Sequence, residues 1–182
     1  MPLTVDEAID FRRSCRSYKP EDLSDEIVDQ IIEAGLKAPT AMNRQQVRFV
    51  VVKNQELLNE ISHIAVSSFP DQYQMYKDRF AEKSIFMGAP VVVFLWADHG
   101  CPGWEIGDSS IAAGQMLVKA ASLEIGSCVV GLSVMGTEES KEQIKAKLQI
   151  PPEGQLVVSL IFGHIEAVGK APRIKEGRVV KL

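Results

Sequence analysis

The sequence has few of the residues that bind metals or form disulfides. Among its 182 residues are three cysteines and three histidines. Cys15, Cys101 and Cys128 are far apart, and neither residue type shows the spacing of a zinc site or a disulfide framework. Scattered cysteines are typical of proteins in a reducing compartment. We therefore expect no metal site and a cytoplasmic location.

Long apolar segments are also absent. The longest apolar run, residues 89–97, is too short to cross a bilayer as a helix. Residues 1–7 contain neither the basic region nor the apolar region of a signal peptide. The sequence therefore predicts no membrane partner.

The chain has no excess of basic side chains. Its 20 lysines and arginines face 24 aspartates and glutamates, which gives a net charge of −4. Nucleic-acid binding is therefore disfavoured. The glycine-rich phosphate-binding motifs of the Rossmann and P-loop folds are missing as well. Against this acidic background, a local cluster of arginines carries more information.

What the sequence does contain is an alternation of helical and strand patterns. Capping residues and apolar periodicity predict helices over residues 5–13, 24–39, 55–66, 107–123 and 137–148, with an irregular helical piece within 67–87. Runs of β-branched and apolar residues predict strands over 47–53, 90–97, 128–134 and 155–163. This alternation indicates an α/β or α+β fold, and we expect one domain over residues 1–182.

Two of these segments suggest contacts beyond the chain itself. Residues 107–123 are apolar on more than one face, which predicts a helix that is central or lies at an interface. Gly126 is expected to end this helix. The basic C-terminal segment finishes in a strand-like stretch, residues 178–182. We expect this stretch to dock on a neighbour such as a second subunit.

The densest cluster of chemistry follows the first predicted helix, over residues 12–18. If the chain is extended there, Arg12, Ser14 and Arg16 point to one side, and Arg13 and Cys15 point to the other. Two guanidinium groups and a hydroxyl suit a phosphate monoester. The alternative is a solvated helix end, where arginines complement the helix dipole.

A second candidate is the loop at residues 38–46, between a predicted helix and a predicted strand. Ligand-binding loops are often found in such places. Asn43 and Gln45 each carry an amide with donors and acceptors, which suits the edge of a flat heterocycle. Ordinary turn chemistry is the alternative.

Two further segments fit a ligand less specifically. The glycines of residues 126–131 allow a flat ligand to approach the backbone, but for this segment taken alone a helix end followed by an ordinary strand is the better explanation. In the tail, Arg173 and Lys175 place basic side chains on one side. A solvated basic tail is the alternative.

Taken together and in this order, these segments resemble the nitroreductase family of FMN-dependent oxidoreductases. Arg12–Tyr18 matches the family's Arg-Arg-Ser-x-Arg-x-aromatic opening, and Ala38–Gln45 matches its Ala-Pro-Ser-x-x-Asn-x-Gln loop. Residues 89–97, 108–123, 126–131 and 150–175 match an apolar strand, an Asp-led central helix, a glycine-containing exit and a last strand with its basic tail. The resemblance covers nearly the whole chain.

The resemblance implies a three-layer fold, with a mainly antiparallel sheet flanked by helices and a tail that reaches the partner subunit. It also implies a homodimer with two FMN sites at the interface. NAD(P)H would reduce the flavin, which would then reduce a nitroaromatic, a quinone or a similar electron-poor small molecule in a ping-pong reaction. The alternatives are a relative with other flavin chemistry, such as dehalogenation, flavin fragmentation or enoyl-type reduction, and a non-catalytic flavin-binding protein.

The resemblance also assigns FMN contacts residue by residue, without a catalytic side chain. Phosphate and ribityl contacts fall on Arg12, Ser14 and Arg16, with Arg13 adjacent, and further phosphate contacts fall on Arg173 and Lys175. The flavin loop supplies Thr40, Asn43 and Gln45 across the dimer interface, and the backbone of Val130 and Gly131 lies near the ring. Gln46 and Val47 stand where the family usually has Pro and Trp. Without the proline, which would stiffen the loop, its geometry is open.

Overall fold

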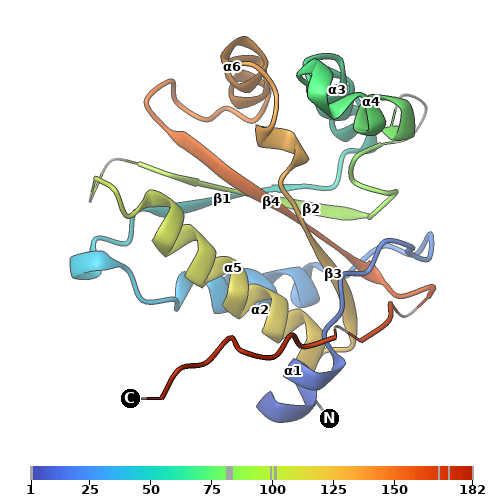
Figure 1. Ribbon diagram of the computed structural model, residues 1–182, viewed down its shortest axis with the longest axis vertical. Helices are drawn as coiled ribbons and strands as arrows, with labels where there is room; N and C mark the ends of the chain where they lie inside the picture. The colour runs from blue at the N-terminus through green and yellow to red at the C-terminus, as the bar shows by residue number, and fades with distance from the viewer. Residues whose placement is uncertain are drawn as a thin grey trace.

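A four-stranded antiparallel sheet forms the middle layer of the structure (Figure 1). The computed structural model describes residues 2–80, 84–98, 100, 102–167, 169–171 and 173–181. The strands are β1 (Val47–Val52), β2 (Val91–Ala97), β3 (Ile125–Val130) and β4 (Gln155–His164), in the spatial order β1-β2-β4-β3. All three neighbouring pairs are antiparallel. The sheet therefore has β1 at one edge and β3 at the other.

Helices cover both faces of this sheet. They are α1 (Val5–Phe11), α2 (Asp25–Leu36), α3 (Gln55–Ser67), α4 (Gln74–Phe80), α5 (Glu105–Ser122) and α6 (Glu138–Lys147). Three short 3₁₀ helices are η1 (Ala41–Asn43), η2 (Asp71–Tyr73) and η3 (Leu132–Val134). Figure 1 shows α1, α2 and α5 on one side of the sheet, with α3, α4 and α6 on the other. The three-layer α+β architecture expected from the sequence is confirmed.

The helix starts lie where the capping residues predict them. Thr4 forms a capping box with Glu7, and the hydroxyls of Ser24 and Thr137 accept hydrogen bonds from the first turns of α2 and α6. None of the helices in the described part of the chain combines the length and hydropathy needed to span a bilayer.

The region around Gly126 differs from the sequence prediction. Glu124, with φ of +57°, takes the left-handed position after α5, and Gly126 lies inside β3. A Cβ at Gly126 would lie 2.8 Å from Ile165 Cγ1 and 3.0 Å from Cys15 Sγ, so close packing explains this glycine. The strand predicted over 128–134 therefore begins earlier, at Ile125, and residues 132–134 form η3.

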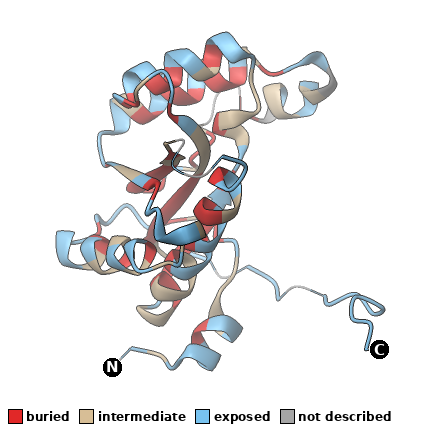
Figure 2. Ribbon diagram, turned by 90° about the vertical axis from the view of Figure 1, so that its left-hand side faces the viewer, coloured by how far each residue is buried: buried red, intermediate tan, exposed pale blue. Residues whose placement is uncertain are grey.

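The sheet is buried on both faces, and β2 is its centre. Every residue of β2 except Trp96 is buried, as expected for the apolar run. On the α3 side, Phe94 packs edge-to-face on Phe86 at 5.6 Å between ring centroids. On the α5 side, Leu95 belongs to a cluster with Met116. Red, buried segments accordingly meet at the sheet in Figure 2.

Helix α5 has two apolar faces, as the sequence predicts. Ala112, Met116 and Ala120 are buried against the sheet. On its outer side, Ile111 is 41% exposed. The outer side borders an open hollow between α1, α2 and α5, lined in part by Val5, Ile9, Ile111 and Val118. An exposed apolar surface of this kind favours contact with another protein surface.

The C-terminal tail is not a strand in this chain. Residues 173–181 are exposed and have no regular secondary structure. Figure 2 shows the tail leaving the body of the molecule. The predicted strand over 178–182 is therefore wrong for the described residues of the isolated chain; Leu182 lies outside the described residues.

Gly163 of β4 gives a test of how tightly the N-terminal segment packs on the sheet. A Cβ there would lie 2.7 Å from both Pro90 Cδ and Tyr18 Cδ1. We expect Gly163→Ala to lower the free energy of unfolding by about 1–3 kcal/mol through overpacking, measured by urea denaturation. Gly131→Ala is the matched control, because its Cβ would find nothing within 4 Å. Equal stability of the two variants would contradict this packing.

Candidate functional site

The arginine-rich segment is extended, as its alternation requires. After α1 ends at Phe11, the Cys15 N–H donates to the Ser127 carbonyl at 2.9 Å, and Ser14 pairs with Ser127 as a parallel bridge. Further on, Tyr18 bridges Ile165 and the Lys19 N–H donates to the His164 carbonyl. Backbone pairing with the outer edge of β3 and the end of β4 therefore fixes this segment.

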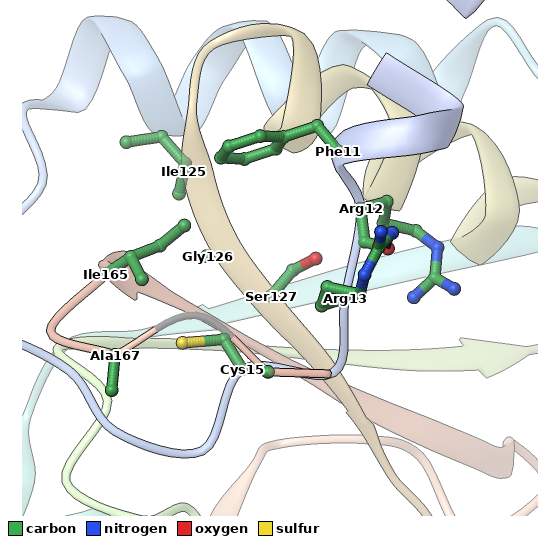
Figure 3. A pocket seen from close by; sticks show the side chains of 10 residues that line it. Phe11, Arg12, Arg13, Cys15, Ile125, Gly126, Ser127, Ile165 and Ala167 are labelled. Atoms are coloured by element: carbon green, nitrogen blue, oxygen red, sulfur yellow. Dashed lines mark hydrogen bonds between the residues drawn. The ribbon is translucent and has the colours of Figure 1, made fainter. Parts of the chain in front are cut away.

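The side chains of the segment point to different places. Cys15 is buried, and in Figure 3 its sulfur points toward Ile165 and Ala167, whereas the guanidinium groups of Arg12 and Arg13 lie on the other side of the chain. The expectation that Arg13 shares a side with Cys15 is therefore wrong. Arg13 Nη1 donates to the Asp10 carbonyl at 2.5 Å and to the Arg12 carbonyl at 2.8 Å. Arg13 therefore closes the end of α1, as the helix-end alternative predicts for it.

Arg12, Ser14 and Arg16 all act to lower the pKa of one buried thiol, that of Cys128. Burial raises the pKa of Cys128, and the charge of Arg16, a hydrogen bond from Ser14 and the charge of Arg12 oppose that rise. Arg12, Ser14 and Arg16 therefore lie near Cys128 on β3, as does Cys15, whose charge adds to the rise. Within the described residues, none of the three arginines of this segment forms an ion pair. Unneutralised guanidinium groups favour an anionic ligand.

The loop before β1 has an unusual backbone. Met42, Asn43 and Gln45 all have positive φ values, between 50° and 53°. A non-glycine residue in this conformation lowers the stability of the fold, so the conformation is found where other contacts maintain it, often at functional sites. Asn43 and Gln45 are exposed and joined by a 3.2 Å hydrogen bond between their amides. The Thr40 hydroxyl accepts from the Gln45 N–H at 2.9 Å, so Thr40 supports the loop from within.

Gln46, which replaces the family's proline, is fully buried. Its Nε2 donates to Asp108 Oδ2 at 2.9 Å, and the Ala41 N–H donates to both carboxylate oxygens at 3.1 Å. Sequence reasoning did not predict this contact, because 62 residues separate its side chains. The available signal was a pair of polar residues, Gln46 and Asp108, at the starts of otherwise apolar elements.

Val130 ends β3, on the same edge of the sheet as the arginine segment, and Gly131 follows it before η3. The Val130 side chain is buried in the core, so only its backbone faces outward. Gly131 is exposed, and a Cβ there would meet nothing within 4 Å. From Ser127 to Gly131 the strand covers roughly 13 Å at about 3.4 Å per residue. A ligand of that length could lie along β3 from the arginines to Gly131.

The chain does not bring the predicted loop residues to the arginine segment. Val47 is in register with Ala97, whereas Ser127 is in register with Phe162 and so with Val91, six residues away along β2. Three strand spacings of about 4.8 Å and six residues of about 3.4 Å place the two sites roughly 25 Å apart. Figure 1 shows η1 and the N-terminal segment at opposite ends of the sheet.

Arg173 and Lys175 are not brought to the arginine segment either. The tail passes close to it at Gly169, where a Cβ would lie 3.5 Å from the Ser14 carbonyl oxygen. Beyond that point both basic residues are exposed, and neither has a hydrogen bond or ion pair with another described residue. Among the described residues, Arg173 and Lys175 thus form no hydrogen bond or ion pair with the other residues predicted to bind FMN.

Comparison with known proteins identifies the family. The model of the nitroreductase family matches residues 9–164. A candidate NADH dehydrogenase/NAD(P)H nitroreductase of Methanothermobacter thermautotrophicus is 31% identical over 152 residues, which are 82% of this chain and 71% of that protein. The chain therefore belongs to the nitroreductase family.

Other similar proteins have flavin in their names. An FMN reductase [NAD(P)H] of Bacillus subtilis is 28% identical over 182 residues, 96% of this chain and 72% of that protein. The solved structure of a nitroreductase with bound FMN from Desulfitobacterium hafniense superposes with a TM-score of 0.87, at 26% identity and with full coverage of both chains. The expected nitroreductase fold is thus confirmed.

Tyr18 provides a test of how the arginine segment is anchored. Its buried hydroxyl donates to the Cys15 carbonyl at 2.8 Å, and burial raises the pKa of Tyr18 far above its ordinary value of about 10. Above pH 10 the unfolded chain therefore releases this proton while the folded chain keeps it. Stability from Tyr18 is present below pH 10 and falls by about 1.4 kcal/mol per pH unit above it.

We expect Tyr18→Phe to cost about 1 kcal/mol at pH 7, because the hydrogen bond is lost. Between pH 10 and 11 the variant should lose less stability than the original protein. Urea denaturation at both pH values measures the difference. Parallel losses in the two proteins would mean that Tyr18 is not held in its buried, protonated form.

Proposed function

We propose that the protein is an FMN-dependent oxidoreductase that uses NAD(P)H to reduce nitroaromatics, quinones or similar electron-poor small molecules. The observation that carries the proposal is the set of guanidinium groups, without an acidic partner among the described residues, fixed along the edge of β3. The names of the relatives support it, since they include an FMN reductase and a nitroreductase with bound FMN.

The residues present fit the chemistry of FMN. Its phosphate carries up to two negative charges near neutral pH, and Arg12 and Arg16 offer planar donor forks with the Ser14 hydroxyl between them in sequence. The open space beside Gly131 admits a flat ring against the backbone. We therefore assign the phosphate to the arginines and the ring to the end of β3.

We further propose a homodimer in which each FMN site is built from both chains. Asn43 and Gln45 lie roughly 25 Å from the arginine segment across the sheet, so the loop of one chain would serve the flavin of the other. The exposed apolar face of α1, α2 and α5 supplies a surface for the second copy. The tail with Arg173 and Lys175 would then pack on the partner.

FMN, when bound, would accept a hydride from NAD(P)H and pass the electrons to the second substrate. The chain's own part is to bind, orient and tune. The backbone at Val130 and Gly131 would support the ring, and the amides of Asn43 and Gln45 from the other subunit would donate and accept at its edge. No side-chain acid or base is assigned to the reaction. Once the oxidised nicotinamide has left, the electron-poor substrate would take its place over the same ring face.

The phosphate assignment is tested by Arg12→Ala combined with Arg16→Ala. Each lost charge-assisted hydrogen bond is worth about 1.5–3 kcal/mol, so we expect the Kd for FMN to rise about 100-fold or more. Quenching of flavin fluorescence measures the Kd. Lys141→Ala combined with Lys147→Ala removes the same charge from α6 and should leave the Kd unchanged. Full FMN occupancy of the arginine variant would contradict the assignment.

Anaerobic addition of NADH and NADPH separates an enzyme from a flavin-binding protein. We expect one or both to bleach the oxidised-flavin absorbance of the purified protein, and an electron-poor substrate to restore it. A flavin-loaded protein that neither reductant bleaches would favour the non-catalytic alternative.

The shared site is tested by subunit complementation. One chain carries Arg12→Ala with Arg16→Ala, and the other carries Asn43→Ala with Gln45→Ala. If each site draws on both chains, a mixed dimer holds one intact site and one doubly damaged site. We expect mixed dimers, refolded together and purified with two affinity tags, to regain up to half the FMN-binding capacity. No recovery would mean that both sets of residues serve the site of a single chain.

A further inference from the structure

Asp108 is a buried carboxylate whose described partners are neutral groups. It is 1% exposed and forms no ion pair with a described residue. Burying a charge in this way is costly unless hydrogen bonds compensate it. Here the compensation comes from the Ala41 N–H and the Gln46 amide, at 3.1 Å and 2.9 Å.

These two donors stand at the two ends of the exposed part of the flavin loop. Between Ala41 and Gln46 lie the three residues with positive φ, and both amides proposed to meet the flavin are among them. Left-handed non-glycine residues crowded into so short a stretch need outside contacts to keep their shape. The Asp108 carboxylate supplies such a contact at both ends of the strained stretch.

We propose that Asp108 is a positioning residue for the flavin, which acts by holding Asn43 and Gln45 in the geometry that reaches the ring. This inference rests on the proposed function. In this chain the buried Gln46 amide and Asp108 together supply the rigidity that a proline at position 46 would give.

The position of Asp108 also ties the loop to the proposed interface. Asp108 lies in the first turn of α5, and the same helix carries the exposed Ile111 at the hollow between α1, α2 and α5. A carboxylate on the helix that faces the second copy therefore sets where the loop stands relative to that copy's flavin. Displacing the carboxylate should move the loop without touching the arginine segment.

The donor and acceptor pattern allows an exchange experiment. Asp108→Asn replaces one of the two acceptor oxygens by an NH₂ group, which then faces the Ala41 N–H and, in one orientation, also the Gln46 NH₂ group. Gln46→Glu turns one carboxylate toward another. The double variant Asp108→Asn with Gln46→Glu reverses the pair and restores the hydrogen bond between the two side chains. The amide oxygen of the substituted side chain on α5 still accepts from the Ala41 N–H.

We expect each single variant to raise the Kd for FMN about tenfold and to change the visible circular dichroism of the protein at saturating FMN. The double variant should return both readouts to near their original values. Ser109→Ala is the matched control on α5, because its buried hydroxyl has no hydrogen-bond partner within the described residues. It should change neither readout.

A purely structural role would lower the melting temperature of the single variants and leave both flavin readouts unchanged, which would overturn the inference while the proposed function stands. If Asp108→Asn gives no folded protein, Gln46→Ala replaces it and should raise the Kd about threefold; no change would again overturn the inference. Failure of the original protein to bind FMN would overturn the proposed function and this inference together.

Discussion

The pairing of the segment after α1 with β3 is the contact on which the candidate site depends. Backbone hydrogen bonds from the Cys15 N–H to the Ser127 carbonyl and from the Lys19 N–H to the His164 carbonyl join this stretch to β3 and to the end of β4. Cys15 then faces the core, and Arg12, Ser14 and Arg16 are left around Cys128. The close packing at Gly126 and Gly163 keeps the segment on the sheet.

The width of the sheet is the second constraint on the candidate site. Strands β2 and β4 separate the loop before β1 from the arginine segment beside β3. A rigid sheet buried on both faces cannot fold its two edges together, so the two sets of side chains proposed to contact FMN remain roughly 25 Å apart. In the proposed homodimer a second copy unites them, and Ile111 on the outer side of α5 is among the exposed apolar residues available for that contact.

Electrostatics and backbone strain mark the same two places. The arginine segment concentrates positive charge without described acidic partners in a chain of net charge −4. The loop concentrates three left-handed residues over a buried carboxylate. Each feature costs stability in an isolated chain, because like charges repel and left-handed residues are strained. Binding of an anionic ligand by these residues would explain why both destabilising features are present.

Much of the fold could be predicted from local signals. Thr4, Ser24 and Thr137 cap helices where expected, and the apolar run of β2 lies in the middle of the sheet. The prediction was wrong around Gly126, because a glycine after an apolar helix usually ends it. Here Glu124 takes that position, and Gly126 is needed to let Cys15 approach β3.

The sequence by itself determined most of the elements, the extended arginine segment and the two-sided apolar character of α5, because these depend on neighbours within a few residues. The tertiary structure decided which residues meet over long distances. It placed Arg13 on the end of α1, Thr40 inside the loop and Asp108 beneath Gln46. Those contacts depend on how the sheet and α5 pack, and the spacing of residues along the chain does not predict that packing.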